Sequence, residues 1–277
     1  MAGRRSKTQR IRHGYCKLTG KPGRFVKSHI IPQALTKISA RGVPFFQYGE
    51  GTRPTQRCSS WYDQGLVIRE GEDILSEIDT RAIEALREHR LVWSSWGEAT
   101  TLGSLHDVIQ DPFGFRQVYT DTKMLRIFFL SLLWRAAESQ LSEFKEIELP
   151  AADAEVIRKA LVDGLEPPMS FYPIQLTQLS TLGPVHNHAP RRDVKYLPCA
   201  DGVERPIDMY RFYFDGLIAH IMLPTLNSVE IGDLGALVLG GESSVVLSTV
   251  TFEKSAQRRD MAAILREYDL HEGFLRQ

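Results

Sequence analysis

The side chains best suited to chemistry lie near the start of the chain, where lysine and arginine are concentrated. Residues 1–60 contain thirteen Lys or Arg and a single acid, Glu50, whereas the other 217 residues carry 21 bases and 33 acids. Cationic side chains at this density attract nucleic-acid phosphates without reading their sequence. The residues predicted to contact phosphate are Arg4, Arg5, Lys7, Arg10, Arg12, Lys17, Lys21, Arg24, Lys27, Lys37 and Arg41.

A solvated basic tail is the alternative interpretation of the same charge. Solvated tails lack apolar residues, yet seven are interleaved with these charges: Phe25, Val26, Ile30, Ile31, Leu35, Phe45 and Phe46. We therefore predict a basic flexible arm over residues 1–14, followed by a folded nucleic-acid-binding module over residues 15–90.

Three short motifs follow one another in this module. They are Cys16-Lys-Leu-Thr19, then Ser28-His29-Ile30-Ile31-Pro32, then the stretch from Tyr62 to Glu72. Together they resemble a group of bacterial HNH-type (His-Me finger) endonucleases. In that group a Cys-x-x-Cys knuckle precedes a strand ending in Ser-His-Ile-Ile-Pro, and a second Cys-x-x-Cys is followed by Glu at a helix start. The resemblance covers residues 15–90 and implies a small ββα-metal fold.

The resemblance also implies roles for His29, Glu72 and Asp63. In the family, the His at the strand end is the general base that activates water against a phosphodiester, and a divalent ion neutralises the developing charge. By position, His29 would be the base, and Glu72 or Asp63 would bind Mg²⁺ or a similar divalent cation. The implied function is hydrolysis of DNA, which is favoured over RNA, in a bacterial antiviral-defence or mobile-element setting.

The sequence departs from the family at the positions that hold structural zinc. These positions are occupied here by Cys16, Thr19, Ile68 and Gly71. A structural zinc needs about four N or S ligands, so we expect no structural zinc. We expect Ile68 to pack against Phe25 and Leu18 in its place.

Two further departures keep a second hypothesis open. Ser28 stands where many HNH enzymes have an Asp ligand, and no clear Asn or His fills the third signature position, although Asp63 and Asp73 lie nearby in sequence. The literal His186-Asn187-His188 is expected to lie in a Pro-flanked loop outside the module. The second hypothesis is a catalytically degenerate HNH-fold subunit that binds nucleic acid, with a partner protein on the acidic body. A third is an assembly subunit whose basic arm contacts an acidic protein.

Each candidate has an ordinary structural interpretation as well. A lone His beside an apolar run is usually hydrogen-bonded within the fold, and an acid such as Glu72 at a helix start is stabilised by the helix dipole. Arg126 and Arg135, within an apolar helix, favour buried ion pairs over phosphate contacts. Four aromatic residues can stack on bases, but core packing is favoured for them: Trp61, Tyr62, Trp93 and Trp96.

The surrounding elements predict an α+β fold with a mainly antiparallel sheet. Apolar periodicity predicts helices at about residues 72–89, 122–144 and 153–164, and a C-terminal helix over residues 254–268 capped by Ser255. A strand over residues 24–31 ends at Pro32, helical turns follow over 33–40, and residues 41–61 are expected to form a loop. Hairpins are predicted around Asp215-Gly216 and around Gly240-Gly241.

The body is therefore expected over residues 91–277, helical at 122–165, hairpin-rich at 170–253 and closed by the C-terminal helix. No apolar run approaches the roughly 20 residues that span a bilayer, and no secretory signal follows Met1. Three widely spaced cysteines give no disulfide framework. The sequence predicts a cytoplasmic protein.

Overall fold

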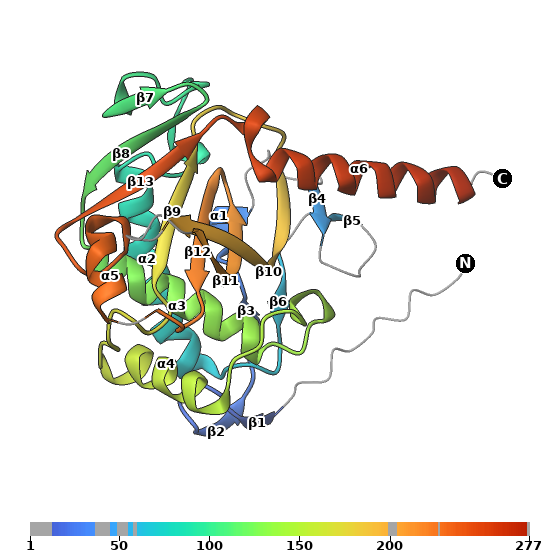
Figure 1. Ribbon diagram of the computed structural model, residues 1–277. Helices are drawn as coiled ribbons and strands as arrows, with labels where there is room; N and C mark the ends of the chain where they lie inside the picture. Colours follow the sequence, from blue (N-terminus) through green and yellow to red (C-terminus); the bar gives the residue numbers. More distant parts are fainter. Residues whose placement is uncertain are drawn as a thin grey trace.

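A nine-stranded sheet forms the centre of the molecule (Figure 1). The computed structural model describes residues 13–36, 45–48, 55–57, 60–198, 204–226 and 228–275. In spatial order the strands are β5 (Thr55–Arg57), β4 (Phe45–Tyr48), β10 (His186–Pro198), β11 (Glu204–Phe214), β12 (Leu217–Met222), β9 (Ile174–Leu179), β13 (Ser244–Val250), β8 (Phe113–Tyr119) and β7 (Val108–Gln110). Among the described strand pairs, only β4–β10 and β9–β13 are parallel. The predicted α+β class with a mostly antiparallel sheet is confirmed.

Helix α3 is the central helix of the core. The described helices are α1 (Gln33–Thr36), α2 (Arg69–Glu88), α3 (Thr122–Glu138), α4 (Ala151–Asp163), α5 (Ser228–Leu234) and α6 (Ala256–Leu275). Phe129 of α3 stacks on Phe214 of β11, with ring centroids 6.1 Å apart, and both α2 and α4 pack against α3. A helix enclosed by a sheet and two helices is apolar on nearly all sides, as α3 is.

Two small sheets precede α2. Strands β1 (His13–Tyr15) and β2 (Pro22–Arg24) form one, and β3 (Ser28–His29) and β6 (Tyr62–Asp63) form the other. Both pairs are antiparallel, and five residues separate β6 from α2. Leu18 belongs to the same hydrophobic cluster as Phe214, so the N-terminal segment shares one core with the main sheet.

Short 3₁₀ helices join several of these elements: η1 (Trp93–Ser95), η2 (Gly103–Leu105), η3 (Ser142–Phe144), η4 (Gly235–Leu237) and η5 (Phe252–Lys254). Trp61, Trp93 and Trp96 are buried, which confirms core packing for these three. No helix among the described residues is both long enough and apolar enough to span a bilayer.

The expected hairpin around Asp215-Gly216 is confirmed. Phe214 pairs with Leu217 across the turn, and both turn residues have positive φ, 50° and 80°, as a type I′ turn requires. The helices α2, α3, α4 and α6 confirm the four periodic segments, with ends shifted by a few residues. Ser255 caps α6, because its Oγ accepts a hydrogen bond from the Arg258 backbone N–H at 3.2 Å.

Four local predictions are wrong. The strand expected over residues 24–31 is reduced to β3, and the loop expected over residues 41–61 contains β4 and β5. The second hairpin does not form, because residues 235–237 are the 3₁₀ helix η4 and β13 pairs with β8 and β9. His186-Asn187-His188 begins β10 and is buried, because its backbone pairs with both β4 and β11.

Candidate functional site

His29 ends the short strand β3, which pairs with β6 (Figure 1). Its register partner across the strand pair is Tyr62, and the two rings meet edge to face with centroids 6.2 Å apart. Among the described residues, none forms a hydrogen bond with the imidazole, and the Nε2 atom is buried without a partner. A structural histidine would be hydrogen-bonded, so this one is not explained by a structural role.

Two other buried polar atoms near His29 also have no hydrogen-bond partner. They are the hydroxyl Oγ of Ser28 and the carboxylate Oε2 of Glu72. The Ser28 hydroxyl lies close enough to the Glu72 carboxylate to lower its pKa, although it forms no well-aligned hydrogen bond. Buried polar atoms are nearly always paired in native proteins. Of these three, Ser28 and Glu72 lie close together, whereas His29 and Glu72 do not contribute to each other's pKa.

The surroundings of His29 favour its neutral form. Burial lowers the pKa of the imidazole from its usual value, the charges of Lys27 and Arg135 lower it further, and only Asp79 opposes them. The neutral ring has a nitrogen lone pair that accepts a proton. His29 is therefore in the protonation state that a general base needs at neutral pH.

Glu72 lies in the first turn of α2, and its backbone N–H donates to the carbonyl of Ile68. Burial raises the pKa of its carboxyl above the usual value, and Ser28, Arg135 and Arg69 act in the opposite direction. A half-buried carboxylate with a free oxygen gains when a cation binds to it. Its place in the first helical turn also favours negative charge.

A buried ion pair holds β3 against the helices. Arg135 of α3 donates to both carboxylate oxygens of Asp79 on α2, at 3.0 and 2.5 Å, and its side chain is 2% exposed. The same guanidinium donates to the backbone carbonyl of His29 at 3.1 Å. Arg135 thus fixes the position of the candidate base. Of the two expected ion pairs this one is confirmed, whereas Arg126 binds carbonyl groups, those of Pro167 and its neighbours.

Asp63 has a structural role in this arrangement. One carboxylate oxygen accepts from the Gly65 backbone N–H at 2.7 Å. The other accepts from the Ser139 hydroxyl and the Gln140 backbone N–H, both at 3.2 Å. These bonds join β6 to the end of α3, so the carboxylate is already satisfied. Asp73, the other nearby acid, is exposed and pairs with Arg69 at 3.7 Å.

In the described ranges, some of the predicted phosphate-binding residues are in ion pairs with acids, and others are not. Lys27 lies over the Tyr62 ring at 4.1 Å, next to His29, and Arg24 is exposed on β2. Lys17 is paired with Glu138 at 3.0 Å, and Lys21 with Glu70 at 2.8 Å. The remaining predicted contacts lie outside the described residues: Arg4, Arg5, Lys7, Arg10, Arg12, Lys37 and Arg41.

The four positions equivalent to a zinc knuckle meet in space. The Thr19 backbone N–H donates to the Cys16 sulfur at 3.4 Å, and a Cβ atom on Gly71 would lie 2.9 Å from that sulfur. Ile68 forms an isolated bridge with Phe25 and shares the core cluster with Leu18. Ile68 thus lies beside Phe25, as the sequence predicts. No group of three or more His, Cys, Asp or Glu suited to a metal occurs within the described part of the chain.

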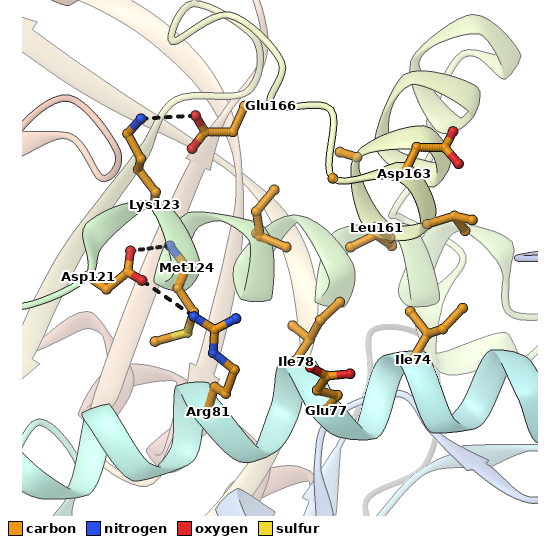
Figure 2. Close-up of a pocket in the computed structure, with 14 residues that line it drawn as sticks. Ile74, Glu77, Ile78, Arg81, Asp121, Lys123, Met124, Leu161, Asp163 and Glu166 are labelled. Atoms are coloured by element: carbon orange, nitrogen blue, oxygen red, sulfur yellow. Dashed lines mark hydrogen bonds and ion pairs between the residues drawn. The ribbon is translucent and has the colours of Figure 1, made fainter.

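A separate cavity of about 670 Å³ lies between α2, α3 and α4 (Figure 2). Its floor is apolar, with Ile74 and Ile78 on α2 opposite Leu161 on α4. Its rim carries two ion pairs, Lys123 with Glu166 at 3.2 Å and Arg81 with Asp121 at 3.6 Å, and two further acids, Glu77 and Asp163. The lining contains no His, Cys, Ser or Thr, so His29 remains the candidate base.

The sequence did not reveal the contribution of Asp79. A signal was present, because Asp79 interrupts the apolar stripe of α2 formed by Leu75, Ala82 and Leu86, all buried. A carboxylate at such a position requires a buried cation, and Arg135 is one of two buried arginines in the apolar helix α3. Ser28 was noted only as a replacement for Asp, not as an unpaired hydroxyl.

Comparison with known proteins finds no match to this chain among protein-family models, curated proteins or solved structures. The function must therefore be argued from the site itself.

Proposed function

We propose that this chain is a metal-dependent endonuclease of HNH type that hydrolyses phosphodiester bonds in DNA, with His29 as general base. The observation that carries the proposal is the imidazole of His29, half-buried, unpartnered among the described residues and held neutral by burial. A two-stranded antiparallel pair, β3–β6, leads into α2, an order that agrees with the strand-strand-helix module implied by the Ser28–Pro32 motif.

The residues present fit a divalent cation. Mg²⁺ prefers hard oxygen ligands, keeps several waters and needs only one or two carboxylates beside the substrate phosphate. Glu72 has a buried oxygen without a partner, and the Ser28 hydroxyl lies beside its carboxylate. These two residues would hold the ion, and the ion would supply charge neutralisation at the phosphate. Asp63 is excluded from this set because its carboxylate is satisfied.

The protein groups each have a defined task in this proposal. His29 accepts the proton of the attacking water, and the Arg135 guanidinium holds the His29 backbone in place. Lys27, stacked on Tyr62, presents a cation beside the base and can bind the phosphate that flanks the scissile bond. Because Lys27 also lowers the pKa of His29, one residue contributes to both substrate binding and the protonation state of the base.

The test is a cleavage assay on plasmid and single-stranded DNA with Mg²⁺, with Mn²⁺ and with EDTA. His29→Ala is expected to abolish metal-dependent cutting while DNA affinity is retained, because the imidazole is assigned to catalysis. His13→Ala is the matched control, since His13 is an exposed histidine on β1 of the same region. Cutting that survives His29→Ala, or that is lost equally in His13→Ala, would refute the assignment.

A catalytically degenerate DNA-binding subunit is the second candidate. The specific observation in its favour is that Asp63, a candidate metal ligand, is tied to the end of α3, while a serine stands before His29. This candidate predicts salt-sensitive DNA binding with no cutting under any metal condition. The same assay therefore separates the two functions.

A further inference from the structure

The face of the main sheet that points away from α3 carries a row of polar side chains. Arg191 of β10 pairs directly with Arg211 of β11, Arg211 with His220 of β12, and His220 with Gln175 of β9. Directly paired residues in antiparallel strands place their side chains on one face. Phe212 and Phe214 alternate with Arg211, and Phe214 contacts α3, so the polar row lies on the opposite face.

Three residues of this row, Arg191, Arg211 and His220, line a cavity of about 440 Å³ beside the first turn of α6. Arg211 is buried there, and it pairs with Asp193 at 3.2 Å and with Asp260 of α6. Lys195 donates to the Gln175 side-chain oxygen at 3.1 Å. Arg259 completes the rim. The cavity shares no residue with the His29 site.

The cations of this cavity exceed its anions by two. Arg191, Lys195, Arg211 and Arg259 face two acids, Asp193 and Asp260. Burial, reinforced by Lys195 and Arg211, lowers the pKa of His220 to about 3, so this ring is uncharged at neutral pH and leaves the excess unchanged.

Three of these cations are incompletely neutralised. Arg191 approaches Asp260 only to 3.8 Å, and its Nε atom is buried without a partner. Arg259 forms no ion pair with any residue in the described ranges, and Lys195 is bonded to an uncharged amide. Burial also lowers the pKa of the Lys195 amine, which reflects the cost of a charge without a counter-ion. Such a group of cations is stabilised by an anion.

We propose that this cavity binds a phosphate dianion, either free phosphate or the terminal phosphate of a small monoester. A phosphate monoester carries about −1.5 to −2 charges at pH 7, which matches the excess of two. The first turn of α6 borders the cavity, and helix N-termini attract anions. A diester of a nucleic-acid backbone has one charge per phosphate and would leave the excess half neutralised. The lining contains no Phe, Tyr or Trp on which a base could stack.

Isothermal titration calorimetry on the full chain tests the proposal, at constant ionic strength, with inorganic phosphate and with AMP. Adenosine and a short single-stranded oligonucleotide without terminal phosphates are the comparison ligands. Phosphate and AMP are expected to bind with a Kd on the order of 0.1 mM, and adenosine is expected not to bind. Arg259→Ala and Lys195→Met should each weaken binding about tenfold, the effect of losing one charge-assisted hydrogen bond.

Arg258→Ala is the matched control, because Arg258 is the neighbouring exposed arginine on α6 and does not line the cavity. It is expected to leave the phosphate Kd within about twofold of wild type. Thermal unfolding of each variant verifies that it is folded. If Arg259→Ala disturbs α6, Lys195→Met still tests the cavity, because Lys195 lies on β10. The proposal is overturned by phosphate heats equal to those of added NaCl, by equal losses in Arg258→Ala and Arg259→Ala, or by competition from the oligonucleotide as strong as that from AMP.

Discussion

Replacing Asp79 with alanine tests how β3 and its histidine are held in place. Asp79 accepts two hydrogen bonds from Arg135, and the two side chains are 17% and 2% exposed. Removing the carboxylate leaves the guanidinium buried and uncompensated. Breaking a buried pair in this way costs about 3–5 kcal/mol in the free energy of unfolding. For a chain of this size the corresponding fall in Tm is about 10 °C.

The matched control is Asp73→Ala on the same helix. Asp73 is also paired with an arginine, but that pair is exposed on both sides and its atoms are 3.7 Å apart. Surface pairs of this kind contribute within about 0.5 kcal/mol, so Tm should hardly change. The assay is thermal unfolding followed by circular dichroism, with urea unfolding as a second measure.

A double variant tests whether the unpaired charge of Arg135 causes the loss of stability. Adding Arg135→Met to Asp79→Ala removes the unpaired charge, and we expect part of the lost stability to return. Two results would show that the buried pair does not stabilise the fold. One is an equal Tm for Asp79→Ala and Asp73→Ala. The other is a double variant that loses more stability than Asp79→Ala and Arg135→Met lose together as single variants.

Two further substitutions test other parts of the fold. Gly71→Ala should lower the free energy of unfolding by about 1–3 kcal/mol, because the added Cβ would lie 2.9 Å from the Cys16 sulfur and 3.1 Å from Val67; an unchanged urea midpoint would contradict the close packing. Burial, opposed by hydrogen bonds from Ser94, raises the pKa of Asp215 from 3.8 to about 6. Between these values the folded state holds a proton that the unfolded state has lost, so this residue reduces stability as the pH rises through that window. Asp215→Asn should remove this contribution, and Tm measured at intervals from pH 4 to 7 should show a smaller decline than in wild type; identical slopes would show that Asp215 does not titrate as described.

Local chemistry explains why some elements could be predicted from the sequence. The Asp215-Gly216 turn depends on two adjacent residues that tolerate positive φ, and the helix ends at Gly164 and Ser255 depend on single residues. α2 and α3 have apolar residues at helical spacing, and this pattern can be read from the sequence without knowing which elements pack against each helix. For these segments the preferred local conformation and the final fold agree.

The failed predictions concern segments whose partners are distant in sequence. β4 forms because it pairs with β10, where Phe46 is the register partner of His186. The residues near Phe46 in the sequence do not indicate this distant strand. Residues 235–239 are apolar enough for a strand, but β13 takes β8 and β9 as its neighbours. At the site, the motif alone identifies His29 and Glu72 as candidates. The ion pair of Asp79 and Arg135, which holds the His29 backbone, depends on the packing of α2 against α3, so the pairing of these two residues could not be predicted.

The pairing of β4 with β10 and the Arg135–His29 contact have a consequence for protein synthesis. Arg135 follows His29 by 106 residues, and β10 begins about 140 residues after β4. A ribosome makes the chain from its N-terminus, so the basic segment emerges long before the groups that position its histidine. The candidate base therefore has no fixed geometry on the nascent chain, and its assembly is delayed until the central sheet can close. Under the proposed function, the site would become active only after the central sheet has formed.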